Sequence, residues 1–105
     1  MVKSLKESYW PPNVPRHYRA PATPLIDNLF TSARRYPDKA ALVFLQRTTS
    51  YAELLSQVER FAAYLQQLGV KRGDRVVLMM QNAPQLVVAH LGILRADAVV
   101  VPVNP

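Results

Sequence analysis

Two histidines are the side chains of this sequence best suited to acid–base or metal chemistry, but their surroundings support neither. His17 and His90 are its only imidazoles, and no carboxylate pair or serine lies at a spacing that would make either one a general base or a metal ligand. The absence of cysteine excludes disulfides, thiolate chemistry and thiol-rich zinc sites. We therefore expect structural roles for both histidines.

A nucleotide site at a strand-to-helix turn is the other chemistry to consider, because helix N-termini bind phosphate. Residues 81–84, Gln-Asn-Ala-Pro, lack the glycines that let backbone amides approach a pyrophosphate, and no Gly-rich Lys-Ser/Thr loop occurs. Met79 and Met80 fit core filler, and Asp74 fits a turn-shaping role beside Gly73. We predict no catalytic, cofactor-binding or metal-ligating residue in this chain.

Length and composition indicate one small globular domain. The chain has 105 residues, of which 50% are hydrophobic and 19% charged. Its net charge of +6 is scattered, without the clustered stripe or zinc-finger spacing of nucleic-acid-binding proteins, so we expect no nucleic-acid partner. The first ten residues lack the apolar core of a signal peptide, which favours the cytoplasm. A basic N-terminal segment is compatible either with a solvated tail or with peripheral contact to an anionic membrane at its inner face.

Prolines dominate the segment 9–24 and predict an extended arm. They occupy positions 11, 12, 15, 21 and 24, where they remove backbone donors and favour polyproline-like conformations. Two interpretations stay open: a loose tail, or an arm whose Tyr9, Trp10 and Tyr18 pack across a neighbouring domain or subunit.

The middle of the sequence predicts a helix, a strand pair and a second helix. Thr23 and Pro24 suit an N-cap and first helical residue, and Ile26, Leu29, Phe30 and Ala33 recur on one face until Pro37. Residues 40–45 form an apolar run that predicts a strand, and residues 46–48 a hairpin turn into Thr49-Ser50.

Ser50 and Glu53 have the spacing of a capping box at the start of the second helix. The apolar face of that helix comprises Leu54, Val58, Phe61, Leu65 and Leu68. Gly69 supplies the left-handed residue that ends it.

The last third predicts a strand, a crossover helix and a parallel strand. Residues 70–73 fit a turn, and the apolar run within 74–80 suits a strand buried on both faces. Asn82 and Pro84 mark the start of a helix that is apolar nearly all round and extends to about Ala96. Residues 98–101 resume a buried strand, giving a right-handed β-α-β unit.

Three motifs in register carry a family resemblance: Thr-Ser-Tyr-Ala-Glu-Leu at 49–54, Gly-Val-Lys-Arg-Gly-Asp-Arg-Val at 69–76, and the stretch 94–105. Together with Pro-Asp-Lys-Ala-Ala at 37–41, they resemble the opening of the AMP-forming acyl-CoA synthetase superfamily over residues 24–105. One position departs, since Asp97 stands where the family usually has glycine. Aspartate tolerates left-handed geometry at a strain of about 1 kcal/mol, so the turn remains possible.

The resemblance implies an α/β fold with about three helices and four strands. It divides the chain into a proline-rich arm, 1–23, and the truncated first part of a large N-terminal adenylating domain, 24–105. The arm looks most like that of bacterial long-chain fatty-acid CoA ligases, which use ATP, magnesium and coenzyme A to convert fatty acids into acyl-CoA, AMP and pyrophosphate.

The resemblance also implies that the phosphate-binding loop, the adenine and ribose motifs and the mobile C-terminal domain lie beyond Pro105. We therefore expect an inert fragment that meets its small-molecule substrates only through the missing regions. The alternatives are another acyl or aryl acid CoA ligase, or an interaction module. Because exposed apolar strands pair readily, we expect the strand within 98–103 to promote self-association.

Overall fold

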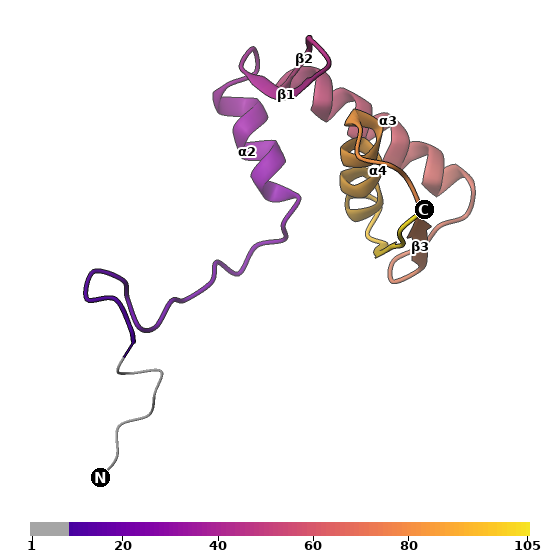
Figure 1. The fold of residues 1–105 in the computed structure, drawn as a ribbon. Coiled ribbons are helices and arrows are strands. Elements are labelled where there is room, and N and C mark those ends of the chain that lie inside the picture. The colour runs from indigo at the N-terminus through magenta and orange to yellow at the C-terminus, as the bar shows by residue number, and fades with distance from the viewer. Residues whose placement is uncertain (1–8) are drawn as a thin grey trace.

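The computed structural model describes residues 9–105 and contains three helices and four strands within them. In chain order the elements are α2 (Asp27–Arg35), β1 (Ala40–Phe44), β2 (Arg47–Ser50), α3 (Tyr51–Gln67), β3 (Arg75–Leu78), α4 (Pro84–Arg95) and β4 (Val99–Pro102). Strands β1 and β2 form an antiparallel pair, and β3 and β4 form a parallel pair joined through α4. The predicted α/β class, hairpin and parallel β-α-β unit are confirmed. Figure 1 labels the helices and the strands β1, β2 and β3.

Helix α2 begins later than its sequence predicts. Asp27 N–H donates to the carbonyl of Pro24 at 3.1 Å, which forms a tight turn before the helix. The N-cap residue is Ile26, which has no side-chain cap bond, so the predicted cap at Thr23 is wrong. The predicted apolar face is largely correct, since Ile26, Leu29 and Ala33 are buried.

The β1–β2 hairpin turns on Leu45 and Gln46, whose φ angles are 48° and 67°. Positive φ at both central residues defines a type I′ turn, whose twist matches that of the flanking strands. Phe44 pairs with Arg47 directly across this turn. The predicted strand end at residue 45 and the predicted turn over 46–48 therefore lie too far along the chain, since β1 ends at Phe44 and β2 begins at Arg47. The Leu-Gln pair carries none of the Asn-Gly signal typical of this turn.

The backbone donors at the start of α3 find acceptors in the loop before β1 and in the last residue of β2. Three early backbone N–H groups have acceptors outside the helix: Tyr51 donates to the Lys39 carbonyl (3.0 Å), Ala52 to the Pro37 carbonyl (3.0 Å) and Glu53 to Ser50 Oγ (3.1 Å). The hydroxyl half of the predicted capping box is thus present, and residues 37–39 satisfy donors that a helix start leaves open.

Helix α3 ends in a Schellman motif at Gly69, whose φ is 97°. Gly69 N–H donates to the carbonyl of Gln66 at 3.0 Å, and Val70 N–H donates to that of Leu65 at 3.1 Å. Val70 also packs against the cluster that contains Leu65, the apolar contact that accompanies this motif. The predicted glycine stop is confirmed, but Leu68, placed on the apolar face, is 63% exposed.

The end of α4 repeats that motif with aspartate in place of glycine. Asp97 has φ 64°, its N–H donates to the carbonyl of Leu94 at 3.0 Å, and Ala98 N–H donates to that of Ile93 at 3.1 Å. The left-handed geometry expected at this position is confirmed. The carbonyl of Asp97 also accepts from Gly73 N–H at 2.9 Å, which connects this turn to the one before β3.

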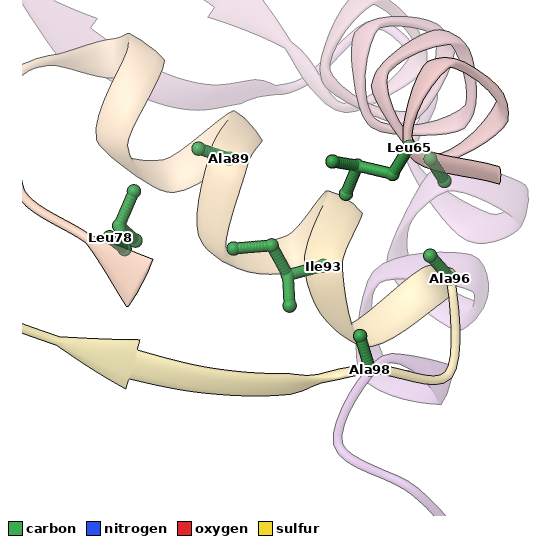
Figure 2. Packing of buried hydrophobic residues seen from close by; sticks show 7 residues of the cluster. Leu65, Leu78, Ala89, Ile93, Ala96 and Ala98 are labelled. Atoms are coloured by element: carbon green, nitrogen blue, oxygen red, sulfur yellow. The ribbon is translucent and has the colours of Figure 1, made fainter. Parts of the chain in front are cut away.

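Helix α4 separates two apolar clusters, which explains why it is apolar nearly all round. Ala89 and Ile93 belong to a cluster with the C-terminal half of α3 and with β3 and β4. Val87, Leu91 and Leu94 pack against a second cluster built by α2 and the N-terminal half of α3. Figure 2 shows Leu65, Leu78, Ile93 and Ala98 of the first cluster. Pro84 starts the helix as predicted, although its N-cap is Ala83 rather than Asn82.

The contact between α3 and α4 depends on Gly92. This glycine is buried, and a Cβ added to it would lie 2.6 Å from Cδ1 and 3.3 Å from Cβ of Phe61. Farther along α4, Arg95 Nε lies 3.4 Å from Glu59 Oε1 of α3, and its guanidinium lies 5.4 Å from the ring centroid of Phe30 of α2. One end of α4 therefore contacts both other helices.

Strand β3 is shorter and less enclosed than predicted. It comprises residues 75–78, and only Leu78 is buried, while Val77 is 64% exposed. On β4, Val99 is 47% exposed. The expectation of burial on both faces is wrong for this chain, because the described residues cover only the face that contacts α4.

Candidate functional site

A groove of about 990 Å³ lies where the hairpin, α3, β3 and α4 meet. The residues that line it are Phe44, Leu45, Arg47, Thr49, Glu53, Gln57, Phe61, residues 76–80, Pro84, Gln85, Val88, Ala89 and Ile93. Five elements, β1, β2, α3, β3 and α4, thus contribute to one surface. The capped start of α3 and the type I′ turn place the hairpin side chains at its edge.

The lining of the groove suits binding better than bond-making chemistry. Arg47 and Glu53 are its charged residues, and Thr49, Gln57 and Gln85 add neutral polar groups. None of the lining residues is a histidine. A mainly apolar surface with a few polar groups is typical of a contact that recognises shape.

The methionines do not fill the core as predicted. Met79 is 61% exposed and Met80 is 36% exposed, and both line the groove. They follow β3 where the chain leaves the parallel pair, so the apolar run continues beyond the part of the strand that the rest of the chain covers. The prediction of core filler is wrong for both residues.

Asp74 lies in the turn before β3, and the two histidines lie on the arm and on α4. Lys71 N–H donates to Oδ2 of Asp74 at 2.7 Å, and Asp74 N–H donates to the Lys71 carbonyl at 3.0 Å, so Asp74 shapes the turn at Gly73 as predicted. His17 is exposed on the arm, whereas His90 is half-buried on α4. Across residues 9–105, no group of three or more His, Cys, Asp or Glu side chains is arranged to hold a metal ion.

Some of the early N–H groups at two helix starts are already engaged. Those of α3 donate to the Lys39 and Pro37 carbonyls and to Ser50 Oγ. At the start of α4, Pro84 contributes no N–H, and Leu86 N–H donates to the Ala83 carbonyl at 3.0 Å. Fewer donors are therefore open to an anion at these two places than a helix start usually offers.

In the part of the chain that the structure describes, no helix is both long enough and apolar enough to cross a membrane.

Comparison with known proteins identifies the family. The sequence profile described as AMP-binding enzyme matches residues 29–105, which is most of the chain. This chain belongs to the AMP-binding enzyme family. The three motifs that suggested the adenylate-forming superfamily all lie within the matched range, so that resemblance is confirmed.

Among curated members of this family, several long-chain-fatty-acid–CoA ligases are similar to the chain. The enzyme of Escherichia coli is 49% identical over 82 residues, covering 77% of the chain and 15% of the enzyme. The Salmonella typhimurium enzyme is 44% identical over 106 residues, covering 99% and 19%, and the Bacillus subtilis enzyme is 36% identical over 96 residues, covering 91% and 17%. The chain thus spans less than a fifth of the length of these relatives.

Several solved structures share the fold of this chain. The N-terminal subdomain of NpsA from Klebsiella oxytoca has a TM-score of 0.73 and 36% identity, covering 76% of this chain and 21% of that one. VinN has a TM-score of 0.74 and 36% identity, covering 77% and 22%. The NpsA subdomain has also been solved in complex with 3-hydroxyanthranilyl-AMSN. The arrangement seen here is therefore that of the N-terminal subdomain of adenylate-forming enzymes.

The groove is the feature that sequence reasoning missed. Its contributors, such as Phe44, Leu45 and Val77, belong to runs of apolar residues that predict full burial, and no motif distinguishes a buried apolar residue from one that lines an open surface. The positive φ values at the hairpin turn, which direct Leu45 outward, had no glycine to signal them.

Proposed function

We propose that this chain forms the N-terminal structural part of an ATP-dependent long-chain fatty-acid–CoA ligase and is catalytically inert by itself. The identity of 49% to the Escherichia coli ligase over 82 residues carries the proposal. In the complete reaction, a fatty-acid carboxylate attacks ATP to give acyl-adenylate and pyrophosphate, and the thiol of coenzyme A then displaces AMP. A different acyl or aryl acid is the alternative substrate, supported by the likeness to NpsA.

The chain's own contribution is proposed to be a scaffold. The described residues provide no glycine-rich loop, no metal cluster and no activated nucleophile, so ATP, magnesium and coenzyme A are assigned to residues outside this chain. What it provides is a helix pair, α3 and α4, that holds the β3–β4 sheet and the hairpin at fixed positions around the groove. We propose that residues 1–23 form the arm and residues 24–105 the start of the adenylating domain.

A segment exchange tests the scaffold role directly. Residues 24–105 replace the matching segment of the Escherichia coli ligase, and acyl-CoA formation from a long-chain fatty acid is measured. We expect a folded chimera that keeps substantial activity, because the exchanged segment supplies shape rather than reacting groups. A second chimera carrying Gly92→Ala, which disrupts the α3–α4 contact, should lose activity together with thermal stability.

The outcome that contradicts the scaffold role is a chimera as stable as the parent ligase but inactive. The inertness of the isolated chain has a separate test, which is carboxylate-dependent exchange of pyrophosphate into ATP. We expect no exchange above background, and exchange by the pure 105-residue chain would refute this part of the proposal.

Self-association is a second candidate property, favoured by the exposed valine face of the parallel pair. Val77 and Val99 are 64% and 47% exposed, although parallel strands are usually covered on both faces. We propose that two copies of the isolated chain pair through this face. Sedimentation should show concentration-dependent dimers, and Val77→Lys should abolish them while Gln66→Lys, an exposed change on α3, should not. A chain that stays monomeric at high concentration would exclude this property.

We also propose a cytoplasmic setting, with peripheral contact at the inner face of the membrane and no nucleic-acid partner. The scattered positive charge, without a clustered stripe, supports the last of these, and the basic residues of the proline-rich arm support the membrane contact.

A further inference from the structure

The arm, defined here as residues 9–24, lies away from the helical body. Every residue of it is exposed, and Figure 1 shows it extending from the start of α2. Tyr9 and Tyr18 are both 81% exposed and Trp10 is 40% exposed. Three aromatic side chains are thus exposed in the described chain, although burying an aromatic ring is more favourable than burying most other side chains.

One part of the arm has a definite local structure. Trp10 Nε1–H donates to the carbonyl of Val14 at 2.7 Å, and Val14 N–H donates to the carbonyl of Pro11 at 3.2 Å. These two bonds hold the indole against a compact turn. The indole N–H therefore has an acceptor within the arm, so the ring can enter a less polar environment without losing that hydrogen bond.

The charge of the arm has one sign. Arg16 and Arg19 lie between Trp10 and the start of α2, and no aspartate or glutamate occurs from residue 8 to residue 26. The whole chain carries a net charge of +6, so a second copy would bring like charge to this segment. An anionic surface is the complementary partner.

The backbone of the arm also suits the interface between water and lipid. Five of its sixteen positions are proline, which has no N–H to desolvate. Tyrosine and tryptophan favour the depth of lipid headgroups, where the ring is apolar and the polar tip stays wet. Arginine adds attraction to anionic headgroups, an effect that weakens as salt screens it.

From these observations we infer that the arm docks on an anionic phospholipid surface, with Trp10 and the two tyrosines at headgroup depth and Arg16 and Arg19 against the phosphates. The inference deepens the membrane contact proposed above and rests on that part of the proposed function. It requires no ligase activity, because neither ATP, fatty acid nor coenzyme A takes part in docking.

Trp10 makes this inference directly measurable, since it is the only tryptophan of the chain. The complete 105-residue chain is titrated with vesicles of phosphatidylcholine containing phosphatidylglycerol, and separately with vesicles of phosphatidylcholine alone. We expect the Trp10 emission to shift to the blue and to be quenched by brominated lipid only with the anionic vesicles. Added salt should reverse both signals.

Paired charge variants locate the contact. Arg16→Gln with Arg19→Gln should lower the vesicle partition coefficient about 30-fold, the loss expected for two basic residues at an anionic surface. The matched control is Arg34→Gln with Arg35→Gln, which removes the same charge from exposed positions on α2 and should leave partition close to that of the unchanged chain. Circular dichroism checks that both variants keep their helices.

Three results would overturn the inference. The first is no change in Trp10 emission with anionic vesicles, and the second is an equal loss of partition in the two charge variants. The third is a blue shift without lipid that grows with protein concentration, which would assign the arm to a second copy of the chain. None of these outcomes bears on the chimera assay, so docking and ligase function can fail separately.

Discussion

Gly92→Ala tests whether the close contact between α3 and α4 is set by the absence of a side chain. In an exposed helix this substitution stabilises by about 1 kcal/mol, because alanine has the higher helix propensity. Here the added Cβ would lie 2.6 Å from Phe61 Cδ1, whereas carbon atoms in favourable contact are about 3.5–4.0 Å apart. Phe61 Cβ, at 3.3 Å, is also close, so rotation of the ring alone does not remove the overlap.

The expected result follows from the difference between these two effects. Forcing an extra methyl into a packed contact costs about 1–3 kcal/mol, and the overlap of about 1 Å implied by ordinary contact distances places this site at the upper end. We therefore expect Gly92→Ala to lower the free energy of unfolding by about 2 kcal/mol after the propensity gain is subtracted. Denaturant unfolding followed by circular dichroism measures this, since Trp10 lies on the arm and does not report on the core.

The control is the same substitution in a chain that carries Phe61→Ala. Alanine at 61 keeps only Cβ, which lies 3.3 Å from the added atom, so alanine at 92 should then cost little, and the double-mutant cycle should give a coupling of about 2 kcal/mol. If Gly92→Ala stabilises the chain with Phe61 present, the steric account of this glycine is refuted.

Three further substitutions test the turns and caps. Asp97→Gly should stabilise the chain by about 1 kcal/mol in thermal or denaturant unfolding, because it removes both the left-handed strain and an anion at a helix C-terminus. Asp97→Asn should give a smaller gain, because it removes only the charge. Equal gains in the two variants would assign the whole effect to charge. Replacing Leu45-Gln46 by Asn-Gly should add about 1 kcal/mol to the unfolding free energy, and a loss would contradict the type I′ turn. Ser50→Ala should cost about 1 kcal/mol in the same assay and Ser50→Asp much less, since only aspartate can still accept from Glu53 N–H.

Local signals in the sequence predicted the ends of elements well where one residue type controls the geometry. Gly69 and Asp97 both take the left-handed conformation expected of them, and Ser50 caps α3. The same reasoning failed at Thr23, because the carbonyl of Pro24 accepts in a tight turn and the helix starts only at Asp27. Capping preferences describe which residues can cap, whereas the turn before the helix decides which one is placed to do so.

Burial was predicted less well than element type, because it depends on what other segments cover. The apolar run after Gly73 predicts a strand correctly, yet Val77 is 64% exposed and Met79 is 61% exposed. Helix α4 shows the opposite case, since most of its apolar residues belong to or pack against one of two clusters on its two sides. The groove could not be predicted for the same reason, since the hairpin, α3, β3 and α4 form it together and no one segment carries its pattern.

The contrast between α4 and β3 is itself an argument for the scaffold role. Both segments have sequences suited to burial on every side, but in this chain only α4 packs against apolar clusters on two sides, whereas β3 has one covered face. Exposure of the valine face of a parallel pair to water is unfavourable by about 25 cal/mol per Å² of apolar surface. The ligase relatives, of which the chain spans less than a fifth, have additional polypeptide that can supply such cover. If the exposed valines serve as a contact for that polypeptide, Val77→Lys should reduce the thermal stability of the chimeric ligase more than Gln66→Lys does.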